Sequence, residues 1–356
     1  MPFELGRMDP RQVTSPQLEG HLPAIRHPSQ PQFHRWIQAK RRAARVKNRF
    51  NRSIVIGGQG AVGQLFAELL RSEGEVTLVD LHRGTPRPGT LSMVADACRP
   101  SPELIAELAE ADIVVIALPE HAGTGAVEAV ARHMPPGALL TETLSVKSGI
   151  VRAMASVAER YDLEALGVNP MFAPDLGFQG QPVVVSKVRG GERCRSLEIL
   201  IDSHGGRLVF LSVQEHDRLT ASLQVATHAS VLTFGWTLQI LDADIGVVAT
   251  AAPPPHRTLL ALLARIVSGT REVYRDIQFA HPHAREVRQA LLDALMHLED
   301  VAMDESADRF DDMLEKIAGW LGPYQEQLTC DCANLFARLA ESQSPAKHTS
   351  VEVLDG

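Results

Sequence analysis

Hydrophobic and polar positions follow two alternating patterns between residues 53 and 212. Short runs rich in valine, isoleucine and leucine are typical of buried strands, and they alternate with stretches whose apolar residues have the spacing of amphipathic helices. The pattern predicts strands at 53–57, 75–80, 111–119, 137–143, 165–170, 182–188 and 207–212, and helices at 61–73, 101–110, 123–133 and 148–160. Strands that alternate with such helices form βαβ units, so we expect an α/β fold with a doubly wound, mostly parallel sheet of the Rossmann type.

The pattern changes after about residue 213, where the strand-like runs stop. Helical periodicity continues over 215–241, 256–281, 284–303 and 307–340, which predicts an all-helical second domain. Its helices are too long and too apolar for one small bundle to cover, so we expect them to pack against a second copy and form a homodimer. The predicted organisation is a flexible, basic lead-in at 1–47, a Rossmann-type domain at 48–212, a helical substrate and dimerisation domain at 213–340, and a disordered tail at 341–356.

Composition and charge narrow the classes of partner. The chain has 45% hydrophobic and 22% charged residues, which is typical of a soluble globular protein. No stretch has the apolar length that spans a bilayer and the N-terminus lacks an apolar signal core, so we expect a cytoplasmic protein without a membrane partner. Residues 1–53 carry 11 basic and 3 acidic side chains, but the remainder of the chain is acidic, which argues against a nucleic-acid partner.

The four cysteines are too few and too scattered for a disulfide framework. Cys330 and Cys332 have no second cysteine or histidine pair nearby. We therefore interpret them as packing residues of a helix and expect no metal site.

A glycine motif with the spacing Gly58-x-Gly60-x-x-Gly63 follows the first predicted strand and opens the first predicted helix. The spacing alone is a weak signal, but the second predicted strand ends in an acidic residue, Asp80, at the distance expected of a dinucleotide site. Gly58 would permit a tight turn, Gly60 would let the backbone approach a pyrophosphate, and Gly63 would allow close packing of helix and strand. Asp80 would bind the ribose hydroxyls and repel a 2′-phosphate, so we predict NAD as cofactor, although two nearby arginines leave room for NADP.

Three polar stretches follow the carboxyl ends of predicted strands, where open parallel sheets bind ligands. They are ALPEHAG at 117–123, TLSVKSG at 143–149 and GVNPMFAPD at 167–175. Pro119, in the first, would adjoin the cofactor, and Ser145 and Lys147 could each donate hydrogen bonds to an anionic substrate or to the nicotinamide region. Asn169 precedes a proline, which favours extended backbone geometry and aims the amide off the end of the strand.

The motifs IGGQGAVGQLF, LSVKSG, NPMFAPD, QEHDRLTASLQVATHA, and ARIV followed by VYRDI resemble, in their order and intervals, the prephenate dehydrogenase family. The resemblance covers about residues 48–340. It implies a Rossmann-type domain followed by a helical dimerisation domain. It also implies oxidative decarboxylation, with NAD, of a cyclohexadiene dicarboxylate to a 4-substituted phenylpyruvate.

The resemblance also implies roles for single residues. Ser145 would lie near the substituent at C4 of the substrate ring, and His228 would bind substrate or support the nicotinamide. Arg265 would pair with a substrate carboxylate, and its apolar neighbours in LALLARIV lead us to expect a buried guanidinium that needs an anion. Arg257 and Gln224 would also bind substrate, and His216 would be structural.

The sequence departs from the family pattern at one chemically important position, because Asn169 stands where the family has a histidine. That histidine is understood to take the hydrogen bond or proton of a 4-hydroxyl group as hydride leaves C4, and an amide cannot act as a base. An amino group at C4 would need no strong base, because its nitrogen lone pair donates electrons better than oxygen does. We therefore expect the substrate to be 4-amino-4-deoxyprephenate, in the branch of secondary metabolism that leads to aminophenylalanine and antibiotics.

Two other interpretations remain open at this stage. The chain could be a prephenate or arogenate dehydrogenase in which His121 or a water molecule replaces the missing base. It could also be an inactive NAD-binding regulator that kept the fold and lost its base.

Overall fold

The structure, a computed structural model, describes residues 50–84 and 88–341. The expected lead-in at 1–47 lies outside these ranges, and so does the expected tail apart from its first residue.

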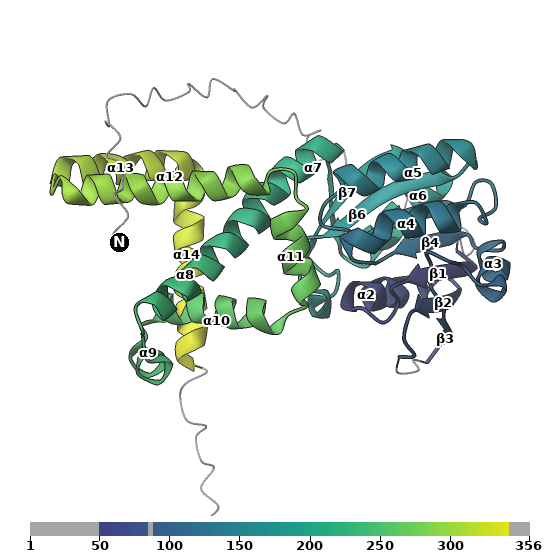
Figure 1. The fold of residues 1–356 in the computed structure, drawn as a ribbon, viewed down its shortest axis with the longest axis horizontal. Coiled ribbons are helices and arrows are strands. Elements are labelled where there is room, and N and C mark those ends of the chain that lie inside the picture. The colour runs from purple at the N-terminus through teal and green to yellow at the C-terminus, as the bar shows by residue number, and fades with distance from the viewer. Residues whose placement is uncertain (1–49, 85–87, 342–356) are drawn as a thin grey trace, which may run out of the picture. The chain divides into compact units, whose positions relative to one another are not determined.

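An eight-stranded sheet forms the first domain (Figure 1). In spatial order its strands are β3 (Thr90–Val94), β2 (Glu75–Asp80), β1 (Arg52–Ile56), β4 (Ile113–Ile116), β5 (Leu139–Glu142), β6 (Glu164–Pro170), β7 (Pro182–Arg189) and β8 (Arg207–Phe210). Neighbouring strands are parallel except for the antiparallel pair β6 and β7. The chain winds outward from β1 to β3 and then returns to place β4 on the other side of β1. This arrangement confirms the predicted doubly wound, mostly parallel fold and puts the switch point between β1 and β4.

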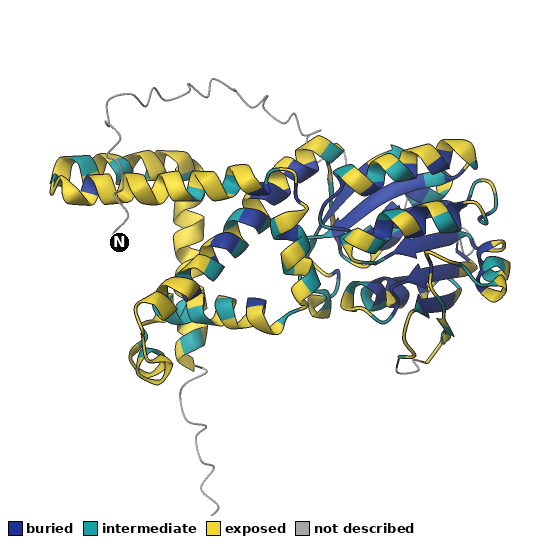
Figure 2. Ribbon diagram, viewed as in Figure 1, coloured by how far each residue is buried: buried dark blue, intermediate teal, exposed yellow. Residues whose placement is uncertain are grey.

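Helices cover both faces of the sheet. One face carries α2 (Ala61–Leu70) and α6 (Glu192–Ser203), and the other carries α3 (Pro102–Leu108), α4 (Glu120–Ala131) and α5 (Ser148–Arg160). Successive strand residues belong to opposite faces, so Ile54 packs with α3 to α5 while Val55 packs with α2 and α6. The central strands are therefore buried on both sides (Figure 2), which explains their continuous apolar runs.

Two elements of this domain are absent from the sequence prediction. Strand β3 is an edge strand whose residues are mostly exposed, so it lacks the apolar run of a central strand. Helix α6 lies between two predicted strands, and its apolar residues Leu197, Leu200 and Ile201 are interspersed with charged ones. Both were missed because their burial depends on neighbours that the local sequence does not reveal.

The second domain is all helical, as the sequence predicts. A continuous helical segment contains α7 (Val213–Thr220), a π-helical stretch η3 (Ala221–Ala226) and α8 (Thr227–Ile240). It is followed by α9 (Ile245–Ala251), α10 (Pro254–Ser268), α11 (Arg271–Phe279), α12 (Ala284–Met303), α13 (Ala307–Leu321), the 3₁₀ turn η4 (Gly322–Tyr324) and α14 (Gln325–Glu341). The predicted helices 256–281 and 307–340 are each broken in two, at Gly269 and at Gly322. Gly322 has a φ of +51°, a left-handed geometry that favours glycine.

Across the described part of the chain, no single helix combines the length and apolar composition needed to cross a membrane. The sharply bent pair Val213–Ile240 and Ile245–Ala251 meets that test only when its two halves are counted together.

Carboxylates of the helical domain cap two helices of the sheet domain. Helix α5 begins at Ser148 without a side-chain cap from its own N-cap residue, Lys147, and Asp217 of α7 supplies one. Asp217 Oδ1 accepts the amide of Lys147 at 3.1 Å, and Oδ2 accepts the amide of Ser148 at 3.1 Å. Helix α4 likewise lacks a cap of its own, and the amide of Glu120 donates to Asp276 Oδ2 of α11 at 3.1 Å. A negative charge at a helix N-terminus is favourable, so both contacts hold the two domains together.

Several acidic groups lie close to the Glu120 carboxyl at this contact between the two domains. Burial raises the pKa of Glu120 to about 7, and repulsion from Glu142, Asp276 and Asp217 adds to the rise while Lys147 opposes it. The folded state therefore favours the neutral carboxyl. Since the pKa is higher in the folded state than in the unfolded chain, stability falls as pH rises from about 4.5 through about 7.

We expect the substitution Glu120→Gln to remove this penalty, because the amide keeps the shape and carries no charge. The variant should melt at a higher temperature than the native protein at pH 8, and the gain should shrink by roughly 2–5 °C at pH 5. Thermal unfolding followed by circular dichroism at both pH values measures the difference. Glu128→Gln, at an exposed position of the same helix, is the matched control and should show no such dependence on pH. An equal shift for Glu120→Gln at both pH values would contradict this account.

Candidate active site

The glycine-rich loop between β1 and α2 is shaped by close backbone contacts. Gly57 has a φ of +77°, and a Cβ atom there would lie 2.2 Å from the carbonyl oxygen of Ala117. A Cβ at Gly63 would lie 2.2 Å from the carbonyl oxygen of Gly57, so Gly63 allows the close helix packing that the motif predicts. A Cβ at Gly58 would lie 2.8 Å from Leu78 Cβ in β2. The turn residue is therefore Gly57 and not Gly58, which corrects the sequence analysis, because only Gly57 has left-handed geometry.

The N-terminus of α2 is open to an anion. Its N-cap residue is Gly60, which has no side chain to satisfy the first backbone N–H groups. A Cβ at Gly60 would meet only the carbonyl oxygen of Gly57, at 3.3 Å, so the outer side of the loop is uncovered. These features fit a pyrophosphate, because helix N-termini offer unpaired N–H donors and positive potential.

A cavity of about 230 Å³ lies at the switch point beside this loop. Gly60, Asp80 and Pro119 all line it, so the structure brings together three of the residues that the sequence analysis assigned to the cofactor. Asp80 Oδ2 also accepts the Gln59 amide at 3.1 Å, which ties the loop to the end of β2. A second carboxylate, Asp96, lines the cavity as well. Two carboxylates in one cavity disfavour a 2′-phosphate, so the residues fit NAD better than NADP.

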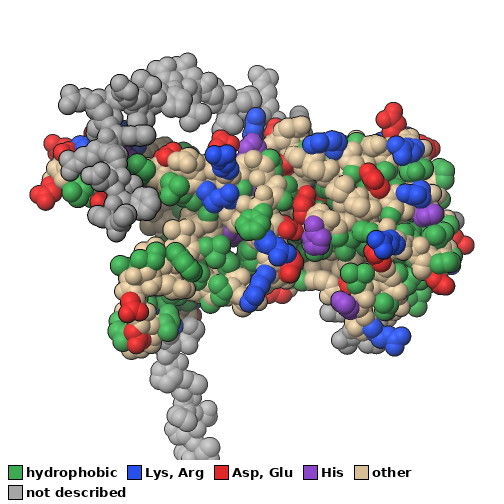
Figure 3. All heavy atoms as spheres, viewed as in Figure 1, with side chains coloured by type: hydrophobic (Ala, Val, Ile, Leu, Met, Phe, Trp, Pro, Cys, Tyr) green, Lys and Arg blue, Asp and Glu red, His purple; other side chains and the backbone are tan. Residues whose placement is uncertain are grey.

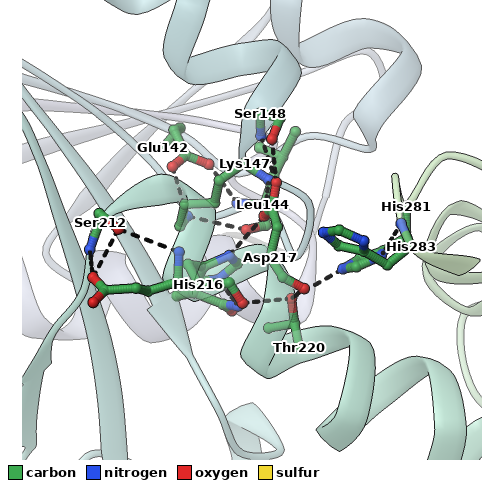
Figure 4. Close-up of polar contacts among 12 residues, drawn as sticks. Glu142, Leu144, Lys147, Ser148, Ser212, His216, Asp217, Thr220, His281 and His283 are labelled. Atoms are coloured by element: carbon green, nitrogen blue, oxygen red, sulfur yellow. Dashed lines mark hydrogen bonds and ion pairs between the residues drawn. The ribbon is translucent and has the colours of Figure 1, made fainter. Parts of the chain in front are cut away.

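Asn169 near the end of β6 is bonded to a histidine of the helical domain. The amide is only 2% exposed, and its Nδ2 atom lies 3.0 Å from Nε2 of His216, which is fully buried. His216 Nδ1 in turn lies 2.9 Å from Asp217 Oδ1 (Figure 4). From the sequence His216 is interpreted as structural and Asp217 is not singled out, although both occur in the EHD triplet.

The charge of Asp217 determines where the hydrogens lie in the row of contacts from Asn169 through His216 to Asp217. Burial by itself would raise the pKa of Asp217, but hydrogen bonds from His216, Ser148 and the Lys147 amide outweigh it and lower the pKa to about 2. Burial lowers the pKa of His216, so its ring is neutral. Because the Asp217 carboxylate can only accept, His216 Nδ1 carries the hydrogen and Nε2 has the lone pair. Asn169 must then donate its NH₂ to Nε2, which leaves Oδ1 on the other side of the amide as an acceptor.

The loop after β5 carries Ser145 and Lys147. Ser145 is half-buried and makes no hydrogen bond with another described residue. Lys147 differs from the sequence expectation, because it is fully buried and its Nζ lies 2.6 Å from Glu142 Oε1 and 3.1 Å from the carbonyl oxygen of Leu144 (Figure 4). Burial raises the pKa of Glu142 and the adjacent ammonium opposes that rise. The role of Lys147 is therefore to stabilise the buried carboxylate below the loop, and not to bind an anionic substrate.

The helical domain contributes a second cluster around α8. His228 packs its ring edge-on against Tyr274, with the ring centres 4.9 Å apart, and its buried Nδ1 has no partner among the described residues. The buried Oε1 of Gln224, one turn earlier in the π-helical stretch, is likewise without a partner within these ranges. Burial and the charge of Arg265 lower the pKa of His228, so the ring is neutral. Unpaired buried polar atoms next to a π-helical stretch are a common mark of a binding site.

The remaining assigned residues are less enclosed than expected. Arg265 is exposed on α10, which overturns the expectation of a buried guanidinium, and its apolar neighbours Leu262 and Val267 are exposed as well. Arg257 is half-buried on the same helix, and His121, weighed as a replacement base, is exposed on α4. Cys330 and Cys332 are exposed on α14, so they are not packing residues within this chain. The described residues hold no group of His, Cys, Asp or Glu able to bind a metal.

Sequence reasoning missed several residues that the structure brings to the site. Gly57, Asp96, Glu120, Asp217 and Tyr274 all belong to this group. The paired glycines GG and the acidic residue directly after Pro119 were visible signals for two of them. The others depend on contacts between segments far apart in the chain.

Comparisons with known proteins agree with this architecture. Residues 66–189 match the sequence family described as "Prephenate dehydrogenase, nucleotide-binding domain". The "4-amino-4-deoxyprephenate dehydrogenase" of Streptomyces pristinaespiralis is 44% identical over 291 residues, which cover 82% of this chain and 98% of that protein. The "T-protein" of Haemophilus influenzae is 26% identical, with 82% of this chain and 72% of that protein covered.

A solved structure shares the fold. The prephenate dehydrogenase of Aquifex aeolicus, crystallised with hydroxyphenyl propionate and NAD⁺, superimposes with a TM-score of 0.59 at 16% identity and covers 75% of this chain and 96% of its own. The alignment with the Streptomyces protein over nearly its whole length confirms the resemblance seen in the motifs. This chain belongs to the prephenate dehydrogenase family of oxidoreductases.

Proposed function

We propose that this protein is an NAD-dependent dehydrogenase that oxidatively decarboxylates 4-amino-4-deoxyprephenate to 4-aminophenylpyruvate, with release of CO₂ and NADH. The observation that carries the proposal is the Asn169 amide, which is bonded to His216 through its NH₂ group and keeps its carbonyl oxygen as an acceptor. The Streptomyces relative, named for this activity, supports the same substrate. Asp80 and Asp96 beside the glycine-rich loop support NAD as the cofactor.

The amide suits an amino substrate better than a hydroxyl substrate. NAD⁺, when bound, accepts the hydride that leaves C4 of the ring. Positive charge then develops on the atom attached to C4, and a nitrogen lone pair carries that charge without losing a proton. Asn169 Oδ1 would accept an N–H bond from the amino group, and the Ser145 hydroxyl could accept or donate another. A hydroxyl substrate would miss the base, and the loss of general-base help costs a factor of about 10²–10⁴ in rate.

Three side chains of the helical domain would hold the carboxylates of the substrate. Arg265 offers a planar guanidinium that can bind a carboxylate through two parallel hydrogen bonds. His228 is neutral and its buried Nδ1 is unpaired, and the Gln224 amide lies one turn away. We place these three side chains on the side of the substrate away from the sheet, with Arg257 as a further positive charge on α10.

An ordinary prephenate or arogenate dehydrogenase is the second candidate, because one titratable group lies close to the sheet edge. Glu120 directly follows Pro119 of the cofactor cavity, and burial together with nearby carboxylates raises its pKa to about 7. A carboxyl with that pKa can accept a proton near neutral pH. An inactive regulator is disfavoured by the intact glycine-rich loop and the retained Ser145, His228 and Arg265.

We infer further that the protein acts as a homodimer in the cytoplasm, where NAD is available. The helical domain exposes apolar side chains on α8, α9, α12 and α13, and some of the most exposed are Trp320 at 82%, Met303 at 75% and Ile240 at 71% (Figure 2). Figure 3 shows apolar side chains gathered around α9. Phe310, Leu314 and Ile317 lie on one face of α13. Large apolar side chains exposed in such number favour a partner, and a second copy offers the same side chains in return.

The substrate assignment predicts a rate difference between two compounds offered to the purified protein. With NAD⁺, we expect kcat/KM for 4-amino-4-deoxyprephenate to exceed that for prephenate by about 100-fold or more, because only the hydroxyl compound needs a base. NADH absorbance at the start of the reaction measures both rates, and NADP⁺ in place of NAD⁺ serves as the cofactor control. Faster turnover of prephenate would refute the amino assignment, and no NADH with either compound would favour the regulator.

Asn169→His should shift the preference toward prephenate. One N–H of the new imidazole can donate to His216 Nε2 as the amide does, and the other nitrogen is then a base directed at the substrate. We expect kcat for prephenate to rise by about 10-fold to 100-fold, whereas Asn169→Ala, which removes the amide without adding a base, should give no gain. The same absorbance assay compares the three proteins. If both variants leave prephenate turnover unchanged, the missing base is not what excludes this compound.

The dimer can be tested on α13. Ile317→Glu combined with Trp320→Glu places two charges on the apolar surface and should convert the dimer to monomer at micromolar concentration. Light scattering coupled to size-exclusion chromatography gives the mass directly. Lys316→Glu, at the exposed polar position directly before Ile317, is the control and should leave the dimer intact. A native protein that elutes as a monomer at all concentrations would exclude this proposal.

A further inference from the structure

We propose that His216 is a positioning residue for the reaction, because it fixes which face of the Asn169 amide is presented to the substrate. This inference rests on the proposed function and deepens it. It assigns the choice between an amino and a hydroxyl substrate to a pair of residues, one from the sheet domain and one from the helical domain. His216 itself does not need to touch the substrate.

The amide of asparagine has two ends of nearly equal shape and opposite hydrogen-bonding character. Nothing in the shape of a pocket distinguishes Nδ2 from Oδ1, so a hydrogen-bond partner must set the orientation. For Asn169 that partner is His216 Nε2, at 3.0 Å. The amide is 2% exposed and the imidazole is fully buried, so water does not compete for the contact.

The imidazole is held in one tautomer by its other nitrogen. His216 Nδ1 donates to Asp217 Oδ1 at 2.9 Å, and the carboxylate has no hydrogen to give back. Asp217 is itself fixed by the amides of Lys147 and Ser148 at the start of α5. The orientation of Asn169 is therefore determined by a row of contacts that ends at a helix N-terminus of the sheet domain.

A second row of hydrogen bonds holds the backbone of His216. The Thr220 hydroxyl donates to the carbonyl oxygen of His216 at 2.9 Å, and His281 Nε2 lies 3.1 Å from the same hydroxyl oxygen (Figure 4). The His283 amide donates to His281 Nδ1 at 3.2 Å, so His281 carries its hydrogen on Nε2 and donates it to Thr220. These bonds fix the backbone of His216, and its fully buried ring is held by the contacts of Nδ1 and Nε2.

The orientation of the Asn169 amide decides whether it offers an acceptor or a donor to the substrate. With the NH₂ group committed to His216, Asn169 Oδ1 is an acceptor that matches an N–H group of an amino substrate. If the amide were released it could turn its NH₂ group toward the substrate, and two donors would then face each other. An unmatched buried donor costs enough to lower kcat/KM by about 10-fold to 100-fold.

A double-mutant cycle separates this role from a purely structural one. We compare the native enzyme, His216→Phe, Asn169→Ala and the double variant, using initial rates of NADH formation with the amino substrate. His216→Phe should lower kcat/KM by about 10-fold to 100-fold when Asn169 is present and by less than about 3-fold when position 169 is alanine. Equal losses in both backgrounds would refute the proposal, because a structural defect does not depend on the amide.

A conservative variant provides the rescue. In His216→Gln, the side-chain carbonyl can accept the Asn169 NH₂ in place of Nε2, although the bond to Asp217 is lost. We expect this variant to keep kcat/KM within about 10-fold of the native value. If His216→Gln is as inactive as His216→Phe while both bind NAD⁺ and melt normally, orientation of the amide is not the role of His216.

Nuclear magnetic resonance provides a readout that needs no turnover and remains informative if His216→Phe does not fold. In ¹⁵N-labelled native protein at about pH 8, where burial keeps the ring neutral, we expect His216 to show a hydrogen on Nδ1 and a lone pair on Nε2. Asn169→Asp replaces the donor by a carboxylate, which needs a hydrogen on Nε2, so the pKa of His216 should rise. A native imidazole with its hydrogen on Nε2 would refute the assignment.

The test of the role of His216 is independent of the test that identifies the substrate. Rates of the native enzyme alone decide whether the amino compound or prephenate is the substrate. If prephenate proves to be the better one, the same cycle measured with prephenate still reports whether His216 acts through Asn169. Strong coupling with prephenate would retain the positioning role, and additivity would remove it.

Discussion

The hydrogen bonds between Asp217 and the start of α5 are the contact on which the rest of the site depends. Helix α5 has no side-chain cap from its own N-cap residue, and a carboxylate of the helical domain accepts its first amides. The same carboxylate accepts the Nδ1 hydrogen of His216. The Asp217 carboxylate therefore caps a helix, joins two domains and selects the tautomer of His216. These hydrogen bonds hold the pKa of Asp217 at about 2.

The charged side chains between the two domains contribute more to the geometry of the site than to the stability of the fold. Asp276 caps α4 as Asp217 caps α5, and both bring negative charge close to Glu120 and the buried Glu142. Lys147 compensates with a fully buried ion pair. Burying such groups costs solvation energy that the attraction only partly returns, so the gain lies in fixing the loop that carries Ser145. Burial, with added repulsion from these carboxylates, raises the pKa of Glu120.

Family membership and the choice of substrate rest on different features of this molecule. The fold is shared with a solved prephenate dehydrogenase, and the sequence aligns with nearly the whole length of a protein named for the 4-amino substrate. At one position near the end of β6 this chain has an amide, Asn169, and not a side chain that can act as a base. Fold membership therefore identifies the dehydrogenase, but the substrate must be argued from the site. The bond from Asn169 to His216 gives that argument a physical basis, because it decides which end of the amide is available.

By itself the sequence determined the alternation of strands and helices, the glycine-rich loop with Asp80, and the unusual asparagine, since these follow from local periodicity and residue chemistry. Only the tertiary structure decided that Gly57 makes the turn, that Lys147 is paired with Glu142, that Arg265 is exposed and that Asn169 meets His216. Each of these depends on segments distant in the chain. Burial and hydrogen-bond partners are set by which surfaces come together, and a local pattern of residues does not contain that information.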